Sequence, residues 1–229
     1  MNPCYLFPCL YGGTCKSYGL SYTCSCIESA YGNNCQYFRD PNANNSTLLE
    51  FDSKQNLKTL LNISVERMYL LYRASVDGFD SKSFHSKCDG ALGTLVLIKS
   101  ENSNIFGGFT KANWGLNNGW QSDSESFLFS LVNSYNTPVK MLVAQPSYAI
   151  ISQSRYHIYF GGDGSLYLSN DGTTGSSYFN SYYRVPSFLA TNEINSFLGG
   201  APSFNIFEIE VYSQYDRKLI YYFKKILFS

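Results

Sequence analysis

Charged residues are scarce in this sequence. The chain of 229 residues holds 17 Lys and Arg against 17 Asp and Glu, so charged residues make up 15% of it and the formal net charge is zero. An average soluble domain has roughly 25%. A chain without excess positive charge lacks the electrostatic footprint of a nucleic-acid-binding protein, and nothing in it favours an acidic substrate. We therefore expect no nucleic-acid partner.

Long apolar segments are missing as well. No apolar run approaches the roughly 20 residues that a membrane-spanning helix needs, so we expect no transmembrane span. The first residues, Met1-Asn2-Pro3-Cys4, contain neither the basic nor the apolar region of a secretory signal peptide. We interpret this absence as an incomplete N-terminus or an internal start, because a cysteine-rich segment begins at the fourth residue.

Cysteine is nearly absent after residue 35. Six of the seven cysteines lie between Cys4 and Cys35, and only Cys88 follows, which predicts a domain boundary. A segment so short cannot bury enough apolar surface to fold unaided. Three disulfides would substitute for a core, each adding about 2–4 kcal/mol. The spacing alone leaves every pairing of the six cysteines open.

Three motifs accompany these cysteines: the turn Gly12-Gly13-Thr14-Cys15, the pattern Tyr22-x-Cys24-x-Cys26 and the final Gly32-x-x-Cys35. Together they resemble an EGF-like module over residues 3 to 36. In that family the first cysteine pairs with the third, the second with the fourth and the fifth with the sixth. The resemblance thus implies the disulfides Cys4–Cys15, Cys9–Cys24 and Cys26–Cys35.

The cysteine-rich segment is poorly suited to metal ions. Zinc ligands come in C-x(2–4)-C pairs, whereas Cys24-x-Cys26 is tighter and the segment contains no His, so zinc is the weaker alternative to disulfides. Calcium-binding EGF-like modules carry an acidic stretch before the first cysteine, and Asp or Asn at the place of Ser17. Here the only acid is Glu28, which supplies too few oxygen ligands for calcium. We expect no metal and no cofactor.

Four residues are candidates for glycosylation. The stretch from Cys9 to Cys15, CLYGGTC, resembles the O-fucosylation site of EGF-like modules, which implies modification of Thr14. N-x-S/T sequons begin at Asn44, Asn45 and Asn62. The first two lie in residues 37–47, a polar stretch without hydrophobic periodicity that we interpret as a linker. All four are hypotheses that depend on passage through the secretory pathway.

Short apolar runs separated by Ser, Asn and Gly dominate the rest of the chain and predict a sheet-rich domain. The stretch 52–62 places Leu57, Leu60 and Leu61 on one face of a short helix after a capping Asp or Ser. Ser81 is the predicted N-cap of one or two further helical turns. Strands are predicted at 68–75, 94–100, 105–110, 126–132, 140–144 and 148–152, on both sides of the Gly162-Asp163-Gly164 turn, and at 204–213.

This domain contains, in order, LLYRASVDGFDSKSFHSKCDGALGTLVLIKS, IFGGFTKANW, SESFLFSL, HIYFGGDGSLYLSND and FEIEVY. These motifs resemble the TLDc domain over about residues 50 to 213. The resemblance implies a sandwich of two antiparallel sheets with a few short helices. We therefore expect a mainly β (α+β) protein, with an EGF-like module at 1–36, a linker at 37–47, a TLDc domain at 48–213 and a C-terminal tail at 214–229.

The stretch SKSFHSKCDG places His85 three residues before Cys88. On a helix the two would be neighbours, as a nucleophile and its base are, and Asp89 or Asp77 could orient the base. Cysteine is, however, among the residue types most often simply buried. Together with the only other histidine, His157, these residues make a sparse ligand set for a metal. We expect a buried reduced thiol at Cys88, with a redox-sensitive or a catalytic thiol as alternatives.

Four acidic residues could form a pair for glycoside hydrolysis, namely Asp163, Asp171, Glu208 and Glu210. Turn positions explain the aspartates better. The alternation of the last strand predicts that both glutamates face solvent, opposite Phe207, Ile209 and Val211. The Gly-rich stretches at 106–109 and 160–165 lack the downstream residues of a phosphate loop. We expect no enzymatic activity.

The tail at 215–229 mixes apolar residues with Arg217, Lys218, Lys224 and Lys225. Contact with a membrane surface is one alternative for it, although a last strand or a docked tail fits its pattern better. The preferred interpretation of the chain is a non-enzymatic binding protein of the extracellular space or secretory pathway, with an unidentified protein or carbohydrate ligand. The EGF-like cysteines support it, because their disulfides would be reduced in the cytosol. The alternative, implied by the TLDc resemblance, is an intracellular factor in oxidative-stress protection or in regulation of the vacuolar proton pump.

Overall fold

The computed structural model describes residues 2–6, 8–10, 13–27, 30–35, 37–38, 46–63, 68–115 and 119–214. The sequon residues Asn44 and Asn45 and the tail at 215–229 lie outside these ranges, so their glycosylation and the contact with a membrane surface stay predictions. In the described part of the chain, no helix is long and apolar enough to cross a bilayer.

The first 38 residues contain short elements that disulfides tie together. The elements are a 3-10 helix η1 (Pro3–Leu6), an antiparallel hairpin of β1 (Thr14–Tyr18) and β2 (Ser21–Ser25), and the pair β3 (Ala30–Tyr31) and β4 (Tyr37–Phe38). The disulfides are Cys4–Cys15, Cys9–Cys24 and Cys26–Cys35, the pairing that the EGF-like resemblance implies. Tyr5 and Leu20 are 81% and 92% exposed. Covalent links therefore replace much of the apolar core in this N-terminal module.

Residues 46–214 form a mainly β domain, as the sequence predicts. Its helices are α1 (Phe51–Leu61), α2 (Ala74–Asp77) and α3 (Ser81–Cys88), with 3-10 turns η4 (Pro146–Tyr148) and η5 (Ile194–Ser196). Its strands are β5 (Tyr69–Arg73), β6 (Thr94–Ser100), β7 (Ile105–Thr110), β8 (Gly119–Gln121), β9 (Phe127–Val132), β10 (Val139–Leu142), β11 (Ile150–Ser152), β12 (Tyr159–Phe160), β13 (Leu166–Leu168), β14 (Thr174–Ser176) and β15 (Ser203–Ser213).

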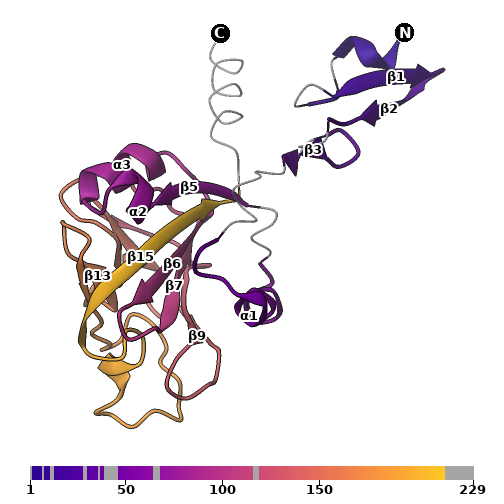
Figure 1. Ribbon diagram of the computed structural model, residues 1–229. Helices are drawn as coiled ribbons and strands as arrows, with labels where there is room; N and C mark the ends of the chain where they lie inside the picture. Colours follow the sequence, from indigo (N-terminus) through magenta and orange to yellow (C-terminus); the bar gives the residue numbers. More distant parts are fainter. Residues whose placement is uncertain are drawn as a thin grey trace.

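The strands of this domain form one continuous antiparallel sheet that folds over into two layers (Figure 1). The long strand β15 belongs to both layers: residues 203–205 pair with β14, whereas residues 206–213 pair with β6, and residues 210–213 also with β5. The first layer has the order β10-β9-β7-β6-β15, and the second has the order β14-β13-β12-β11-β8. The predicted sandwich of antiparallel sheets is thereby confirmed.

Buried side chains of the two layers meet in one apolar core. Val96 of β6 and Val211 of β15 belong to it from the first layer, and Phe160 of β12 belongs to it from the second. Gly108 of β7 lets the layers approach, because a Cβ at this position would lie 2.6 Å from the Phe160 ring. Close packing of the layers thus accounts for the Gly-rich stretch at 106–109.

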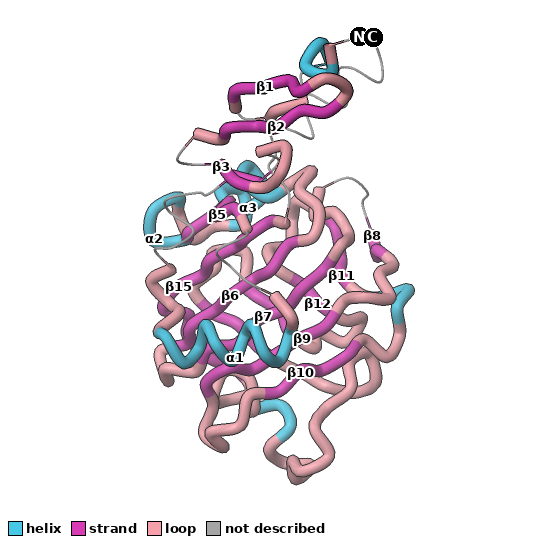
Figure 2. The backbone as a smooth tube through the Cα atoms, turned by 90° about the vertical axis from the view of Figure 1, so that its right-hand side faces the viewer, coloured by secondary structure: helices cyan, strands magenta, loops and turns pink. Residues whose placement is uncertain are grey.

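The other face of the first layer is covered by α1 (Figure 2). Leu57 and Leu61 of the helix are buried in a second core with Leu95 and Leu97 of β6 and with Tyr212 of β15. Strand β6 is therefore buried on both faces, which explains its uninterrupted apolar run.

Both predicted helices are present, but their caps differ from the prediction. The N-cap of α1 is Glu50, with an extended backbone and no side-chain cap hydrogen bond, rather than an Asp or Ser within residues 52–53. The N-cap of α3 is Asp80 rather than Ser81, and its Oδ1 accepts a hydrogen bond from the Ser83 N–H at 3.0 Å. For α3, Asp and Ser are both strong N-caps, so the residue type alone does not decide between the adjacent positions 80 and 81.

The predicted faces of β15 are wrong for three residues. Glu208 is 5% and Glu210 is 0% exposed, whereas Phe207 is 62% exposed. A β-bulge between Ile206 and Glu208 shifts the register against β6, so the alternation of faces changes at Phe207. Residues 46–49 and α1 then cover the face on which Glu210 lies. The strand is therefore not half solvated.

Candidate functional site

Helix α3 brings His85 and Cys88 to the buried side of the domain. His85 is 7% and Cys88 is 0% exposed. Phe84 directly precedes His85 in sequence, and its ring packs edge-on against Trp114 with 5.4 Å between ring centroids. The same Phe84 ring stacks on His157 at 4.8 Å and meets the His85 ring at 5.1 Å. Both described histidines therefore surround one buried aromatic side chain.

Both ring nitrogens of His85 face oxygen acceptors. Nδ1 lies 2.6 Å from Oδ1 of Asp89, and Nε2 lies 2.7 Å from the backbone oxygen of Tyr156. Burial, the largest single effect, lowers the pKa of His85, but the hydrogen bonds to Asp89 and to the Tyr156 carbonyl together raise it above its ordinary value. A doubly protonated imidazolium satisfies both acceptors, because each of its nitrogens carries a proton.

This geometry does not form the nucleophile and base that the sequence leaves open. With both nitrogens of His85 occupied, neither is available to take a proton from Cys88. Asp77 does not orient the imidazole either, since its oxygens accept from the Arg73 N–H at 2.9 Å and from Lys87 Nζ at 2.6 Å. Of the two suggested orienting carboxylates, only Asp89 contacts His85. The arrangement fits a structural role for α3 and its buried thiol.

The pKa of His157 is shifted in the opposite direction to that of His85. It is 1% exposed, and its Nε2 lies 2.9 Å from the backbone oxygen of Phe79. Its Nδ1 is buried and has no hydrogen-bond partner among the described residues. Burial lowers the pKa of His157 to about 4. The ring is therefore neutral at pH 7, with its single proton on Nε2 and donated to the Phe79 carbonyl.

The aspartates of the glycosidase hypothesis stabilise turns. Asp163 accepts hydrogen bonds from Ser165 Oγ at 2.5 Å and from the Asn180 N–H at 2.8 Å. Asp171 accepts from Ser169 Oγ at 2.5 Å and from the Thr173 N–H at 3.1 Å. Asp171 is thus engaged within its own turn, and Asp163 joins its turn to the segment that follows β14. Across the residues with described positions, no three His, Cys, Asp or Glu side chains gather to hold a metal ion.

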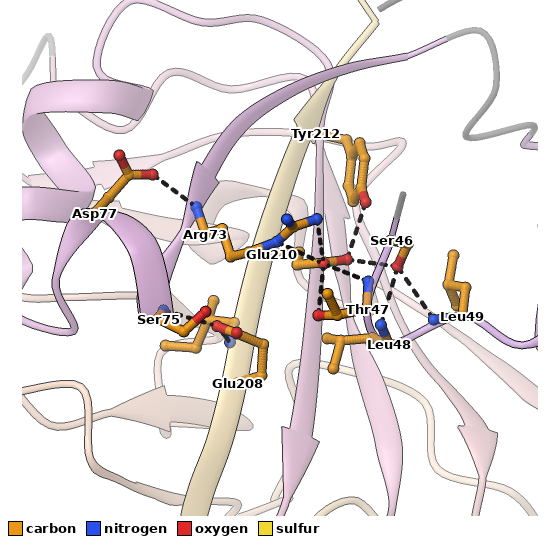
Figure 3. A network of polar contacts seen from close by, with 11 residues as sticks. Ser46, Thr47, Leu48, Leu49, Arg73, Ser75, Asp77, Glu208, Glu210 and Tyr212 are labelled. Carbon is orange, nitrogen blue, oxygen red and sulfur yellow. Dashed lines mark hydrogen bonds and ion pairs between the residues drawn. The ribbon is translucent and has the colours of Figure 1, made fainter. Parts of the chain in front are cut away.

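The glutamates of β15 are engaged in a buried network instead (Figure 3). Oε1 of Glu210 accepts from the Thr47 N–H at 2.9 Å and pairs with Arg73, whose Nε and terminal nitrogen lie 3.0 and 2.9 Å away. Oε2 accepts from Ser46 Oγ at 2.5 Å and from the Tyr212 hydroxyl at 2.9 Å. The network joins residues 46–47, which precede α1, to β5 and β15.

Glu208 extends this network to α2. One of its oxygens accepts from the Ser75 N–H at 3.1 Å and from the Ile209 N–H at 2.9 Å. Arg73, at the end of β5, also donates its backbone N–H to Asp77. Both glutamates accept hydrogen bonds from more than one donor. A carboxylate that is already hydrogen-bonded in this way has little capacity left to bind a substrate, so the arrangement is typical of a structural anchor.

Comparison with protein-family models assigns this domain. The model described as the TLDc domain matches residues 42–214. The chain belongs to the TLDc family. The match begins before the anchoring residues 46–47 and ends after β15, so it contains the whole Glu210 network. The disulfide-linked module lies outside the matched residues, and the TLDc match carries no information about it.

The sequence interpretation missed the Glu210 network of the TLDc domain. A signal for it existed: Arg73 ends an otherwise apolar strand and Glu210 lies between the apolar Ile209 and Val211, and charges in buried strands are rarely left unpaired. The sequence did not show which strands are neighbours. β5 and β15 pair directly although they are far apart in sequence. Ser46 and Thr47 gave no signal, because in sequence they belong to the polar linker.

Substitution of Cys88 distinguishes a structural from a chemical role. Cys88→Ala removes a fully buried sulfur and is expected to lower the free energy of unfolding by about 1–3 kcal/mol. Urea denaturation followed by tryptophan fluorescence measures this change. In the native protein, a thiol reagent should label Cys88 only as fast as the domain unfolds. Rapid labelling of the folded protein, together with an unchanged free energy of unfolding, would favour the redox-sensitive thiol.

Proposed function

We propose that this TLDc protein is a non-enzymatic binding protein of the extracellular space or secretory pathway. In this proposal, residues 3–36 form an EGF-like module, and both modules offer surfaces to a protein or carbohydrate ligand. The observation that carries the proposal is the set of three disulfides in the N-terminal module. Such a module has little core of its own, and its disulfides persist only in an oxidising compartment.

The surroundings of the candidate catalytic residues support a non-enzymatic role. His85 has both nitrogens engaged, and Cys88 is fully buried. Glu210 is surrounded by hydroxyl, amide and guanidinium donors. Two candidate glycosylation residues are accessible, since Thr14 and Asn62 are both exposed.

A non-reducing peptide map of the protein from its native source tests the proposal. We expect the three disulfides, a single alkylatable cysteine at position 88 after unfolding, and glycan on at least one of Thr14, Asn44, Asn45 and Asn62. Alkylation of all seven cysteines without prior reduction, with no glycan, would contradict it. The N-terminal module would then not be folded in the cell as it is in this structure.

Membership of the TLDc family favours a second candidate. Intracellular TLDc proteins are associated with oxidative-stress protection and with the vacuolar proton pump, and this chain would act as one of them. The peptide map separates the two candidates, because a cytosolic chain would carry reduced cysteines. Co-purification of the reduced protein with the proton pump would then support the second candidate.

A further inference from the structure

Two surface hollows lie side by side at the end of the TLDc domain where β15 begins, the lower end in Figure 1. The larger has a volume of about 370 Å³ and the smaller of about 250 Å³. Small-molecule sites in proteins occupy roughly 300–1,000 Å³, so the two together have the size of a site for a small ligand. Asn102, in the turn between β6 and β7, lines both. The hollows are therefore neighbours on the surface, on either side of Asn102.

The two hollows have the same kind of lining. The larger is lined by Glu193, by carboxamides that include Asn104 and Asn192, and by the rings of Tyr135 and Phe197. The smaller is lined by Glu101, Asn205, Thr174 and the ring of Phe204. Each hollow thus combines one carboxylate, carboxamides, hydroxyls and at least one aromatic ring. Among the described residues, no Lys or Arg lines either of them.

This lining selects the chemistry of the ligand. A carboxylate without a cation repels phosphate, sulfate and acidic sugars. Carboxamides and hydroxyls both donate and accept hydrogen bonds, as each hydroxyl of a neutral sugar also does. The half-buried Tyr135 ring offers an apolar surface to the C–H groups of a sugar ring. A neutral polyhydroxylated ligand matches all three properties.

The polar groups of the hollows are held in place before any ligand arrives. Asn102 and Asn104 donate their side-chain N–H groups to the backbone oxygens of Gly199 and Leu198 at 3.0 and 2.7 Å. Glu193 accepts from the Ala190 N–H at 3.0 Å. Besides the bonds from Ala190 and the Tyr135 side chain, the Glu193 carboxylate keeps acceptor sites for a ligand, because a carboxylate accepts about four hydrogen bonds. Groups that are already ordered lose little entropy on binding.

Glu101 and the backbone at Gly200 complete this arrangement. Glu101 accepts from Asn205 Nδ2 at 2.9 Å, and neither Glu101 nor Glu193 forms an ion pair with a described residue. Gly200 has a φ of +86°, and a Cβ there would lie 2.9 Å from Nδ2 of Asn102. A side chain at position 200 would therefore displace the residue that the two hollows share.

We propose that the two hollows are adjacent subsites for a neutral oligosaccharide, with Asn102 between two sugar residues and Glu193 and Glu101 accepting from sugar hydroxyls. The inference rests on the proposed function as a binding protein and names its ligand class. Nothing in it requires catalysis, because the two carboxylates serve different sugar residues.

Ligand-observed NMR with the intact protein tests the subsites. The probes are methyl glycosides of glucose, galactose, mannose and N-acetylglucosamine, and the β1,4-linked disaccharides cellobiose and chitobiose. We expect binding of at least one monosaccharide glycoside, and at least about tenfold tighter binding of a disaccharide that contains it. Glu193→Gln and Gly200→Ala should each weaken binding by about tenfold, the effect of losing one hydrogen bond to a charged acceptor or displacing Asn102.

The matched control is Glu125→Gln, which removes an exposed carboxylate paired with Lys111 and should leave binding unchanged. Far-UV circular dichroism and tryptophan fluorescence establish that each variant is folded. Tetramethylammonium and glucuronic acid are the charged probes. The inference is overturned if no neutral sugar binds up to about 50 mM, if a charged probe binds more tightly than every sugar, or if both variants bind as the wild type does.

The outcome is separable from that of the proposed function. An oxidised, glycosylated protein that binds no sugar refutes the subsites and leaves the extracellular assignment standing. A protein whose cysteines are reduced at its source, yet which binds a neutral disaccharide through Glu193, refutes the extracellular assignment and leaves the subsites standing.

Discussion

Lowering the pH from about 7.5 to about 4.5 is expected to reduce the contribution of His157 to the free energy of unfolding by about 2–3 kcal/mol. Burial lowers the pKa of this histidine to about 4 in the folded protein, whereas an unfolded histidine has a pKa of about 6.5. A depressed folded-state pKa stabilises the fold above the unfolded pKa, and this stabilisation is lost as the pH falls through the window between the two values. The TLDc domain is therefore expected to be acid-sensitive in that window.

The groups around His157 explain why it resists protonation. Its ring lies against Phe84 and Tyr72, which offer no hydrogen-bond acceptor to a second ring proton at contact distance. After burial, the next effects are the hydrogen bond to the Phe79 carbonyl, which raises the pKa, and the charge of His85, which lowers it. Asp80 and Asp171 raise it further but are exposed, so solvent screens them.

The variant His157→Gln tests this prediction. A glutamine amide can donate to the Phe79 carbonyl in place of Nε2–H, but it does not titrate. Urea unfolding at both pH values, followed by fluorescence of the buried Trp114, gives the free energy of unfolding for each protein. The wild type should lose about 2–3 kcal/mol more than the variant on acidification. Equal losses in the two proteins would show that another group causes the acid sensitivity.

His85→Gln is the matched control, because its pH dependence has the opposite sign. The folded-state pKa of His85 is raised by Asp89 and the Tyr156 carbonyl. Its contribution to stability is therefore fully present below the unfolded pKa of about 6.5 and is lost as the pH rises through the raised pKa. The His85 substitution should destabilise the domain more at about pH 4.5 than in alkaline solution, whereas the His157 substitution should become less harmful in acid.

Local pattern was enough to predict most of the TLDc sandwich. The hairpin of β6 and β7, the Gly162-Asp163-Gly164 turn between β12 and β13, and helix α1 all lie where apolar periodicity and turn residues place them. These features depend on neighbours in sequence, which a single chain reveals. The spacing of the six N-terminal cysteines was likewise informative, because it occurs together with the glycines of the motifs Gly12-Gly13-Thr14-Cys15 and Gly32-x-x-Cys35.

The faces of β15 could not be predicted, because they depend on long-range packing. Ile209 and Val211 lie in the core between the layers, as the alternation predicts, whereas the β-bulge between Ile206 and Glu208 leaves Phe207 exposed. The local sequence predicts that the opposite face of the strand is exposed to solvent, because it carries the two charges of Glu208 and Glu210. Glu210 is tolerated inside only because residues 46–47 and Arg73 arrive from elsewhere in the chain.

The chemistry of the histidines was also beyond the sequence. The spacing of His85 and Cys88 suggested a pair, whereas the acceptors that decide the protonation state of His85 are Asp89 and the distant Tyr156 carbonyl. His157 was counted only as a further ligand. Its burial against Phe84 follows from the meeting of α3 with the segment before β12, which no local pattern encodes.

Glu210→Ala should lower the free energy of unfolding by about 3–5 kcal/mol, the cost of breaking a buried ion pair. The carboxylate is 0% exposed and accepts from four residues. Its loss leaves the Arg73 guanidinium without its buried counter-ion and the Thr47 N–H without its acceptor. The control Glu125→Gln removes an exposed carboxylate with a surface partner and should change stability by less than about 1 kcal/mol.

A double-mutant cycle separates the ion pair from the rest of the network. Arg73→Leu and Glu210→Leu should each be strongly destabilising, but the double variant should cost at least about 1 kcal/mol less than the sum of the two. Hydrogen exchange gives a second measure: the amides of residues 48–61 should lose protection in the Glu210 variant, because residues 46–47 are then no longer tied to β15. Additive effects on the free energy of unfolding, together with unchanged protection of α1, would contradict the role of Glu210 in holding α1 over the first layer.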